Sequence, residues 1–174
     1  MPESQGFNGL RVAAFESRMA DEMGRLIIRH GGQPFVAPSM REIPLRDNHE
    51  GLLFGAQLLA GRLDMVIWLT GVGARTMVEV LQTRWPLDQI KAALGRVTLV
   101  ARGPKPVAAL KEFGLAATIT VPEPNTWRDI LQTLDAAKPP AGLRIAVQEY
   151  GVPSADLLKA LRERGGHVTS VPVY

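Results

Sequence analysis

The residues best suited to chemistry follow short apolar runs and precede segments of helical spacing. Thr70 ends one such run and is followed by Gly71-Val72-Gly73, and Arg102-Gly103-Pro104-Lys105 follows another. A threonine hydroxyl can donate or accept a hydrogen bond, and glycines let a ligand approach the backbone closely. Arginine and lysine pair with carboxylates, arginine in a bidentate way. These two segments therefore predict a site for an anionic ligand.

Further candidate residues also lie where a predicted strand meets a predicted helix. For Thr126 the first expectation is the N-cap or the first turn of a helix, and ligand binding is the second. The chain has two tyrosines, Tyr150 and Tyr174, and a tyrosine at the end of a strand can donate a proton to a reacting group. The remaining candidates for ligand binding are Arg18 and Gly151.

Several chemistries are excluded by residue type and spacing. The chain has no cysteine, which excludes disulfides, thiolate metal sites and cysteine nucleophiles. Its histidines, His30, His49 and His167, are not spaced as a metal-binding pair. Thr76 stands where a dinucleotide-binding motif beginning at Gly71 needs its third glycine, and the sequence has neither a P-loop nor a G-x-S-x-G motif. We therefore expect no metal and no cofactor.

The composition is that of an ordinary globular protein. The 174 residues suffice for one large domain or two small ones, with 46% hydrophobic and 21% charged residues. The net charge of +3 comes without any long basic run, so we expect no nucleic-acid partner. The sequence has no apolar run of about 20 residues and begins with no secretion signal. We expect a cytoplasmic protein with no membrane partner.

Segments of strand and helix character alternate along the chain. Aliphatic and β-branched runs predict strands at 11–15, 34–37, 65–69, 97–101, 118–121, 144–148 and 167–173. Helical periodicity predicts helices at 18–30, 50–62, 74–83, 87–94, 104–113, 125–134 and 154–164, with Ser154 as a cap and Gly31 and Gly165 as helix ends. Such alternation indicates an α/β fold of parallel sheets, in which ligands bind beyond the carboxyl ends of the strands.

The two ends of the chain resemble each other. Gly9–Glu16 and Gly142–Glu149 have similar sequences, and each is followed by a predicted helix and a pair of glycines. One interpretation is a duplicated β-α-β unit in a two-lobed molecule, and the alternative is that any two such units look alike.

Three segments together resemble the uroporphyrinogen-III synthase family: Asp64–Gly73, Leu99–Leu115 and Leu161–Tyr174. Their order and spacing carry the resemblance, which covers nearly the whole chain. It implies two lobes of parallel sheet flanked by helices, the second complete and the first only partly present. The implied division is 1–38 for the first β-α-β part of lobe one, 39–48 for an inter-lobe linker strand, 49–170 for lobe two and 171–174 for a return linker strand.

The resemblance also implies a function in haem biosynthesis. A synthase of this family is a lyase that cyclises hydroxymethylbilane to uroporphyrinogen III, with inversion of ring D and loss of water and without a cofactor. Tyr174 falls on the family's tyrosine, which assists loss of the hydroxyl group. Thr70 falls on a threonine of the family's cleft, whereas Gly71 departs from the more usual serine. The expected residues for binding the polycarboxylate tetrapyrrole are Arg18, Thr70, Gly71, Val72, Gly73, Arg102, Gly103, Lys105, Thr126, Tyr150 and Gly151.

The resemblance leaves two functions open. Family members continue past the matched tyrosine with further βα units, so we expect this sequence to be either a truncated part of a longer protein or one piece of a split protein, and to be poorly active by itself. We also expect a monomer. The alternative to the synthase is a catalytically weak, synthase-like ligand-sensing domain of a regulator.

Overall fold

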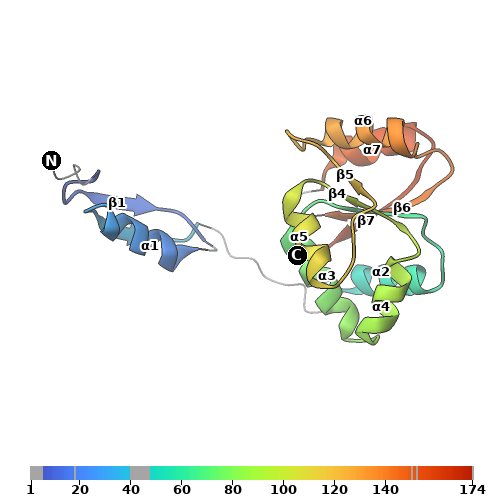
Figure 1. The fold of residues 1–174 in the computed structure, drawn as a ribbon, viewed down its shortest axis with the longest axis horizontal. Coiled ribbons are helices and arrows are strands. Elements are labelled where there is room, and N and C mark those ends of the chain that lie inside the picture. The colour runs from blue at the N-terminus through green and yellow to red at the C-terminus, as the bar shows by residue number, and fades with distance from the viewer. Residues whose placement is uncertain (1–5, 18, 40–47, 150, 152, 174) are drawn as a thin grey trace. The chain divides into compact units, whose positions relative to one another are not determined.

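The chain forms two compact units in the computed structural model, Met1–Ile43 and Pro44–Tyr174 (Figure 1). The structure describes residues 6–17, 19–39, 48–149, 151 and 153–173. Each unit contains a parallel sheet, as the alternation of segments predicts. The finer division into lobes and linker strands stays a prediction.

The first unit is a single β-α-β motif. It consists of β1 (Arg11–Ala14), α1 (Ala20–Arg29) and β2 (Gln33–Val36), with β1 and β2 parallel. Ile27 is its one buried side chain among the described residues, whereas Phe15 and Phe35 are 65% and 58% exposed. One helix on two short strands offers too little surface to bury the apolar side chains that these strands carry.

The second unit is a five-stranded parallel sheet with the strand order β5-β4-β3-β6-β7. Its strands are β3 (Met65–Trp68), β4 (Thr98–Ala101), β5 (Ile119–Thr120), β6 (Arg144–Glu149) and β7 (His167–Pro172). Its helices are α2 (His49–Leu59), α3 (Gly71–Gln82), α4 (Leu87–Leu94), α5 (Pro104–Glu112), α6 (Trp127–Ala137) and α7 (Ala155–Glu163). The predicted α/β class is confirmed.

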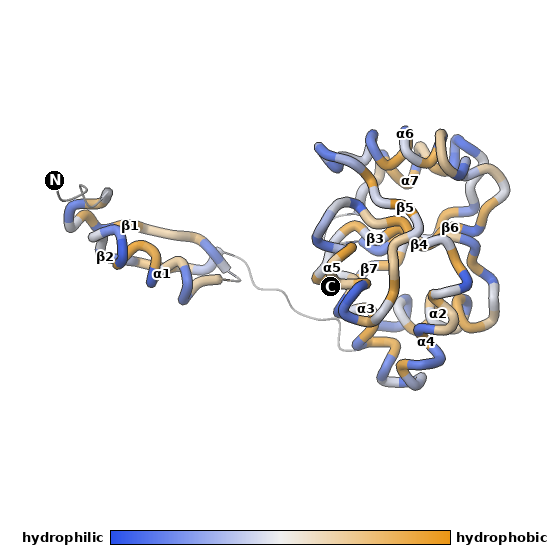
Figure 2. Tube along the Cα trace, in the orientation of Figure 1, coloured by the Kyte–Doolittle hydropathy of each residue, from blue (hydrophilic) through white to orange (hydrophobic). Residues whose placement is uncertain are grey.

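Helices cover both faces of this sheet, and alternate side chains of each strand supply two cores. Val66 and Trp68 of β3 pack in a cluster with residues of α2, α3, α4 and α5. Met65 and Ile67 of the same strand pack with residues of α6 and α7 on the other face. Figure 2 shows hydrophobic residues concentrated in these central strands. A strand buried on both faces is apolar throughout, which explains the uninterrupted Met65–Leu69 run.

The resemblance between the two ends of the chain extends to hydrogen bonding. In the first unit Gly9 N donates to Gly31 O at 2.6 Å and Gln33 N to Leu10 O at 2.8 Å. In the second unit the matching bonds run from Gly142 N to Gly165 O at 2.9 Å and from His167 N to Leu143 O at 2.8 Å. All four glycines have positive φ angles, from 73° to 82°. In both β-α-β motifs, the same pair of hydrogen bonds therefore joins the segment before the first strand to the start of the second strand.

Several helix bounds differ from the prediction by up to three residues, and two local differences lie near the carboxyl ends of β3 and β6. Helix α3 begins at Gly71, three residues before the predicted start, because Thr70 caps it. The Ser154 side chain makes no capping hydrogen bond, so that prediction is wrong. The Ser154 N–H instead donates to the Glu149 carboxylate at 3.0 Å. A carboxylate from the preceding strand thus replaces the local cap.

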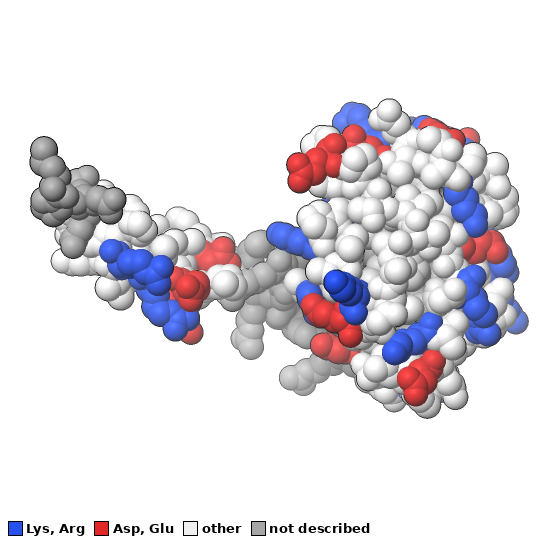
Figure 3. All heavy atoms as spheres, viewed as in Figure 1, with Lys and Arg blue, Asp and Glu red and all other residues white. Residues whose placement is uncertain are grey.

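The surface of the second unit carries charges of both signs. On the face shown in Figure 3, the Lys and Arg side chains are interspersed with Asp and Glu. The net charge of +3 is therefore not gathered into one basic patch on this face. Within the described residues, no helix is both long enough and apolar enough to span a membrane.

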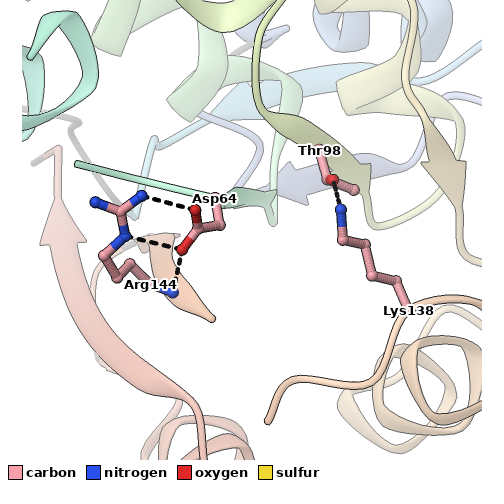
Figure 4. A network of polar contacts seen from close by, with 4 residues as sticks. All are labelled: Asp64, Thr98, Lys138 and Arg144. Atoms are coloured by element: carbon pink, nitrogen blue, oxygen red, sulfur yellow. Dashed lines mark hydrogen bonds and ion pairs between the residues drawn. The ribbon is translucent and has the colours of Figure 1, made fainter. Parts of the chain in front are cut away.

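An ion pair joins the amino ends of β3 and β6 (Figure 4). The Asp64 carboxylate accepts hydrogen bonds from the Arg144 backbone N–H at 2.8 Å and from Nε and Nη2 of its guanidinium at 2.8 and 2.7 Å. These bonds from Arg144 lower the pKa of Asp64 from 3.8 to about 2. At the same edge, Lys138 Nζ donates to Thr98 Oγ1 at 2.8 Å.

The lowered pKa of Asp64 predicts an acid-dependent loss of stability. Because the folded-state pKa lies below 3.8, this contribution is present above that pH and is lost as the pH falls towards about 2. We expect Asp64→Asn to lower the free energy of unfolding by about 1 kcal/mol at pH 7, since the pair is partly solvent-exposed. Urea unfolding at pH 7, 4 and 2.5 measures the effect, with Glu163→Gln in an exposed 3.8 Å pair as control. Equal losses at pH 7 and pH 2.5 would contradict this assignment.

Candidate functional site

The five-stranded sheet has a topological switch point between β3 and β6. From β3 the chain proceeds outwards to β4 and β5, whereas from β6 it proceeds in the other direction to β7. The helices that follow these two strands, α3 and α7, pack on opposite faces. In open α/β sheets ligands bind in the crevice where such connections diverge. The carboxyl ends of β3 and β6 are therefore the candidate site.

Thr70 lies at this point and caps α3. Its Oγ1 accepts a hydrogen bond from Gly73 N at 3.0 Å, which satisfies one of the unpaired N–H groups at the helix start. Its own N–H donates to Gln148 Oε1 at 3.2 Å, which ties β3 to β6. The hydroxyl proton of Thr70 is bonded to no other described residue. Thr70 can therefore cap its helix and still donate a hydrogen bond to a ligand.

Gly71 and Gly73 are buried, and the chain's own atoms lie beside them. A Cβ atom on Gly71 would come within 2.6 Å of the Lys105 carbonyl oxygen, and one on Gly73 within 2.0 Å of Gln148 Nε2. Gly71 thus allows close approach of the first turn of α5, and Gly73 that of the Gln148 side chain. The approach of a ligand to these glycines stays a prediction. Val72, between them, is half-buried.

Arg102 is a half-buried cation at the end of β4, the neighbour of β3. Its backbone N–H donates to Trp68 O at 3.0 Å, but no described residue pairs with its guanidinium. Burial accordingly lowers the pKa of Arg102. Three other arginines each form a bidentate pair with a carboxylate: Arg75, Arg144 and Arg164. Arg102 is therefore available to a carboxylate that comes from elsewhere.

The loop after Arg102 depends on Gly103. This residue is buried with a φ of 86°, a conformation that favours glycine, and its Cα faces the Asn125 side chain. Lys105 follows in the first turn of α5 and is exposed. The loops after β4 and β5 therefore pack against each other at the same edge of the sheet as Thr70.

Thr126 is the N-cap of α6, as its first predicted role requires. It forms a capping box with Asp129: its N–H and hydroxyl donate to Asp129 Oδ2 at 2.7 and 2.6 Å. These bonds from Thr126 lower the pKa of Asp129. The hydroxyl proton of Thr126 is therefore used within the capping box. The role of Thr126 in substrate binding stays a prediction.

Two buried polar side chains at this edge, Gln148 and Glu149, were not predicted to belong to the site. They are 2% and 1% exposed and lie at the carboxyl end of β6. Gln148 accepts the Thr70 N–H, and Glu149 accepts hydrogen bonds from Ser154 N and from Ser170 Oγ at 2.9 Å. The available signal was two polar residues at the end of an otherwise apolar strand.

Comparison with known proteins places this arrangement in a family. A family model described as uroporphyrinogen-III synthase HemD matches residues 21–174. The chain belongs to the uroporphyrinogen-III synthase family. Solved structures of uroporphyrinogen III synthase from the extremely thermophilic bacterium Thermus thermophilus have the same fold. The native wild-type crystal gives a TM-score of 0.67 at 28% identity, and a selenomethionine variant gives 0.72 at 27% identity. The predicted family resemblance is confirmed.

The chain spans only part of these relatives. Each match to a Thermus structure includes 95% of this chain but only 61% of the Thermus synthase chain. The uncharacterized protein YjjA of Bacillus subtilis strain 168 is 27% identical over 173 residues, which are 98% of this chain and 62% of YjjA. Family and fold thus identify a protein like uroporphyrinogen-III synthase.

Some predicted site residues of this synthase-like chain are not placed by the structure. Arg18, Tyr150 and Tyr174 lie outside the described residues. Gly151 is exposed with a φ of 62°, and no heavy atom lies within 4 Å of its ideal Cβ position. Their roles in binding or catalysis stay predictions.

The histidines of this synthase-like chain stand at the ends of secondary-structure elements. His30 caps the end of α1, whereas His49 and His167 are the first residues of α2 and β7. No group of three or more histidine or acidic residues within the described ranges could hold a metal ion.

Proposed function

We propose that this chain is part of a uroporphyrinogen-III synthase, which converts hydroxymethylbilane into uroporphyrinogen III and water. The observation that carries the proposal is Arg102, which is half-buried beside the switch point of a synthase-family sheet and has no partner among the residues that the structure describes. The substrate is a linear tetrapyrrole with many carboxylates. A guanidinium held partly out of water gains more from pairing with a carboxylate than an exposed lysine does.

In this proposal the strand-end residues hold the substrate rather than attack it. Arg102 and Lys105 pair with carboxylates of the substrate. The hydroxyl of Thr70 donates a hydrogen bond to the substrate at the N-terminus of α3. Gly71, Val72, Gly73 and Gly103 belong to the same proposed set, and the three glycines also leave room for neighbouring atoms of the chain. Arg18, Thr126, Tyr150 and Gly151 complete the proposed binding set.

The proposed reaction is an elimination followed by ring closure. The C–O bond of the terminal hydroxymethyl group breaks, and its oxygen leaves as water with a proton donated by the Tyr174 phenol. This leaves an azafulvene-like cation at the end of the chain. The last pyrrole ring is inverted before closure, and one of its carbons attacks the cation. The ring then loses a proton. Because the electron-rich chain ionises readily, most of the rate acceleration comes from holding the substrate in the cyclising conformation.

Tyr174→Phe tests the proposed acid. We expect kcat to fall about tenfold, less than the ~10²–10⁴-fold typical of general acids, because the substrate ionises with little help. Steady-state assays of hydroxymethylbilane consumption measure the change, and circular dichroism checks that the variant is folded. Complete loss of activity in a folded variant would show that Tyr174 has a larger role.

A ligand-sensing domain is the second candidate, and the surroundings of Gly71 favour it. The resemblance implies a serine at this position, whereas here the Lys105 carbonyl group occupies the space that a side chain would need. A sensor would bind the tetrapyrrole without turning it over. The test uses the natural protein, that is, the protein as it occurs in its organism. Binding of the tetrapyrrole measured by calorimetry, together with no turnover, would support the sensor against the synthase.

A further inference from the structure

Gln148 and Glu149 place two polar side chains where a sheet interior is otherwise apolar. Both lie at the carboxyl end of β6, and both are almost completely buried. Neighbouring residues of the same strand, Ile145 and Val147, are in the hydrophobic core. Burial of polar groups costs free energy unless they are hydrogen-bonded, and burial of a carboxylate costs more. Their hydrogen bonds therefore indicate what these residues do.

Gln148 joins β6 to the start of α3. Its Oε1 accepts the Thr70 N–H at 3.2 Å, and its Nε2 donates to the Glu149 carbonyl oxygen at 2.7 Å. The side chain fills the space beside Gly73, where an ideal Cβ atom would come within 2.0 Å of Nε2. The absence of a side chain at Gly73 is thus matched to the position of Gln148.

Glu149 joins β6 to the start of α7 and to β7. Its Oε1 accepts the Ser154 N–H at 3.0 Å, and its Oε2 accepts the Ser170 hydroxyl at 2.9 Å. No cation among the described residues pairs with this carboxylate. A hydrophobic residue of similar volume would fill the space without burying a charge. A reason for the carboxylate beyond stability is therefore required.

We propose that Gln148 and Glu149 are positioning residues for the synthase reaction, which fix the spacing of the β3–α3 and β6–α7 connections around the substrate. This inference rests on the proposed function. Together the two side chains bond to the N-cap residue of α3, to the residue before α7 and to β7. A small change in this spacing would misplace the groups that hold the tetrapyrrole, and a 1 Å misplacement can cost about 10²-fold in rate.

Substitutions that keep the volume separate positioning from packing. Glu149→Leu removes both acceptors, and Glu149→Gln can still accept the Ser154 N–H while donating to the Ser170 oxygen. We expect kcat of the natural protein to fall about 10–100-fold in Glu149→Leu, with KM nearly unchanged, and to be largely retained in Glu149→Gln. Gln148→Met is expected to lower kcat similarly. Thr98→Val, which removes a buried polar contact with Lys138 at the opposite edge of the sheet, should leave kcat unchanged.

Amide hydrogen exchange provides the readout that does not depend on activity. Exchange at Ser154 should accelerate in Glu149→Leu, and exchange at Thr70 should accelerate in Gln148→Met. Wild-type kcat in both folded variants would overturn the inference, and unchanged exchange at both amides would overturn it as well. If the unmodified natural protein does not convert hydroxymethylbilane, the proposed function fails, and the exchange data then show separately whether the two side chains hold these connections.

Discussion

Arg102→Gln is expected to raise the KM for hydroxymethylbilane about 10–100-fold, since a hydrogen-bonded charge is worth about 1.5–3 kcal/mol. The guanidinium is half-buried and has no partner among the described residues, so its loss should not destabilise the fold. We expect the free energy of unfolding to change by less than about 1 kcal/mol. Steady-state kinetics and urea unfolding of the natural protein measure the two effects separately.

Arg96→Gln is the matched control for Arg102→Gln. Arg96 precedes the amino end of β4 and is exposed, whereas Arg102 follows the carboxyl end of the same strand. Both substitutions remove one positive charge, so a general effect of net charge on substrate attraction would appear in both. Equal KM values for the two variants would contradict a specific role for Arg102.

Gly71→Ala is expected to lower both stability and turnover. Its Cβ atom would lie 2.6 Å from the Lys105 carbonyl oxygen and 3.0 Å from the carbonyl carbon, so two backbone segments would have to separate. Overpacking of this kind costs about 1–3 kcal/mol, which exceeds the gain of about 1 kcal/mol from alanine's helix propensity. Because the displaced segments are the starts of α3 and of α5, which follow Thr70 and Arg102, kcat/KM should fall about 10–100-fold.

Gly95→Ala is the control for this substitution. Gly95 has helical φ and ψ angles of −66° and −13°, and its ideal Cβ atom would lie no closer than 3.4 Å to the atoms around it. Alanine there is expected to stabilise the fold by about 0.4–1 kcal/mol and to leave turnover unchanged. Thermal unfolding of both variants measures the change in stability, and steady-state assays measure the change in turnover. A Gly71→Ala protein as stable and as active as the unmodified one would contradict the packing described here.

Local features of the fold were predictable because they depend on neighbouring residues. The apolar Met65–Leu69 run predicts a strand, and β3 occupies Met65–Trp68, with all four side chains buried. Thr126 stands three residues before Asp129, and this spacing suffices for the capping box that the structure contains. Gly165 ends α7 with a positive φ angle, as its position after the helix predicts.

Contacts between distant segments were not predictable in the same way. Thr70 and Gln148 are 78 residues apart, and their hydrogen bond follows only from the adjacency of β3 and β6. The sequence also does not show that the Lys105 carbonyl group lies beside Gly71 and the Gln148 side chain beside Gly73. Ser154 has the side chain of a cap, but the buried Glu149 carboxylate takes its N–H. Such competition between local and distant partners is decided by tertiary packing.

The most direct test of the proposed function is the isomer of the product. The natural protein is incubated with hydroxymethylbilane, the product is oxidised to the porphyrin, and the type I and type III isomers are separated by liquid chromatography. A synthase should yield mainly the type III isomer, formed faster than any product without protein. Formation of only the type I isomer, at the rate seen without protein, would contradict the account.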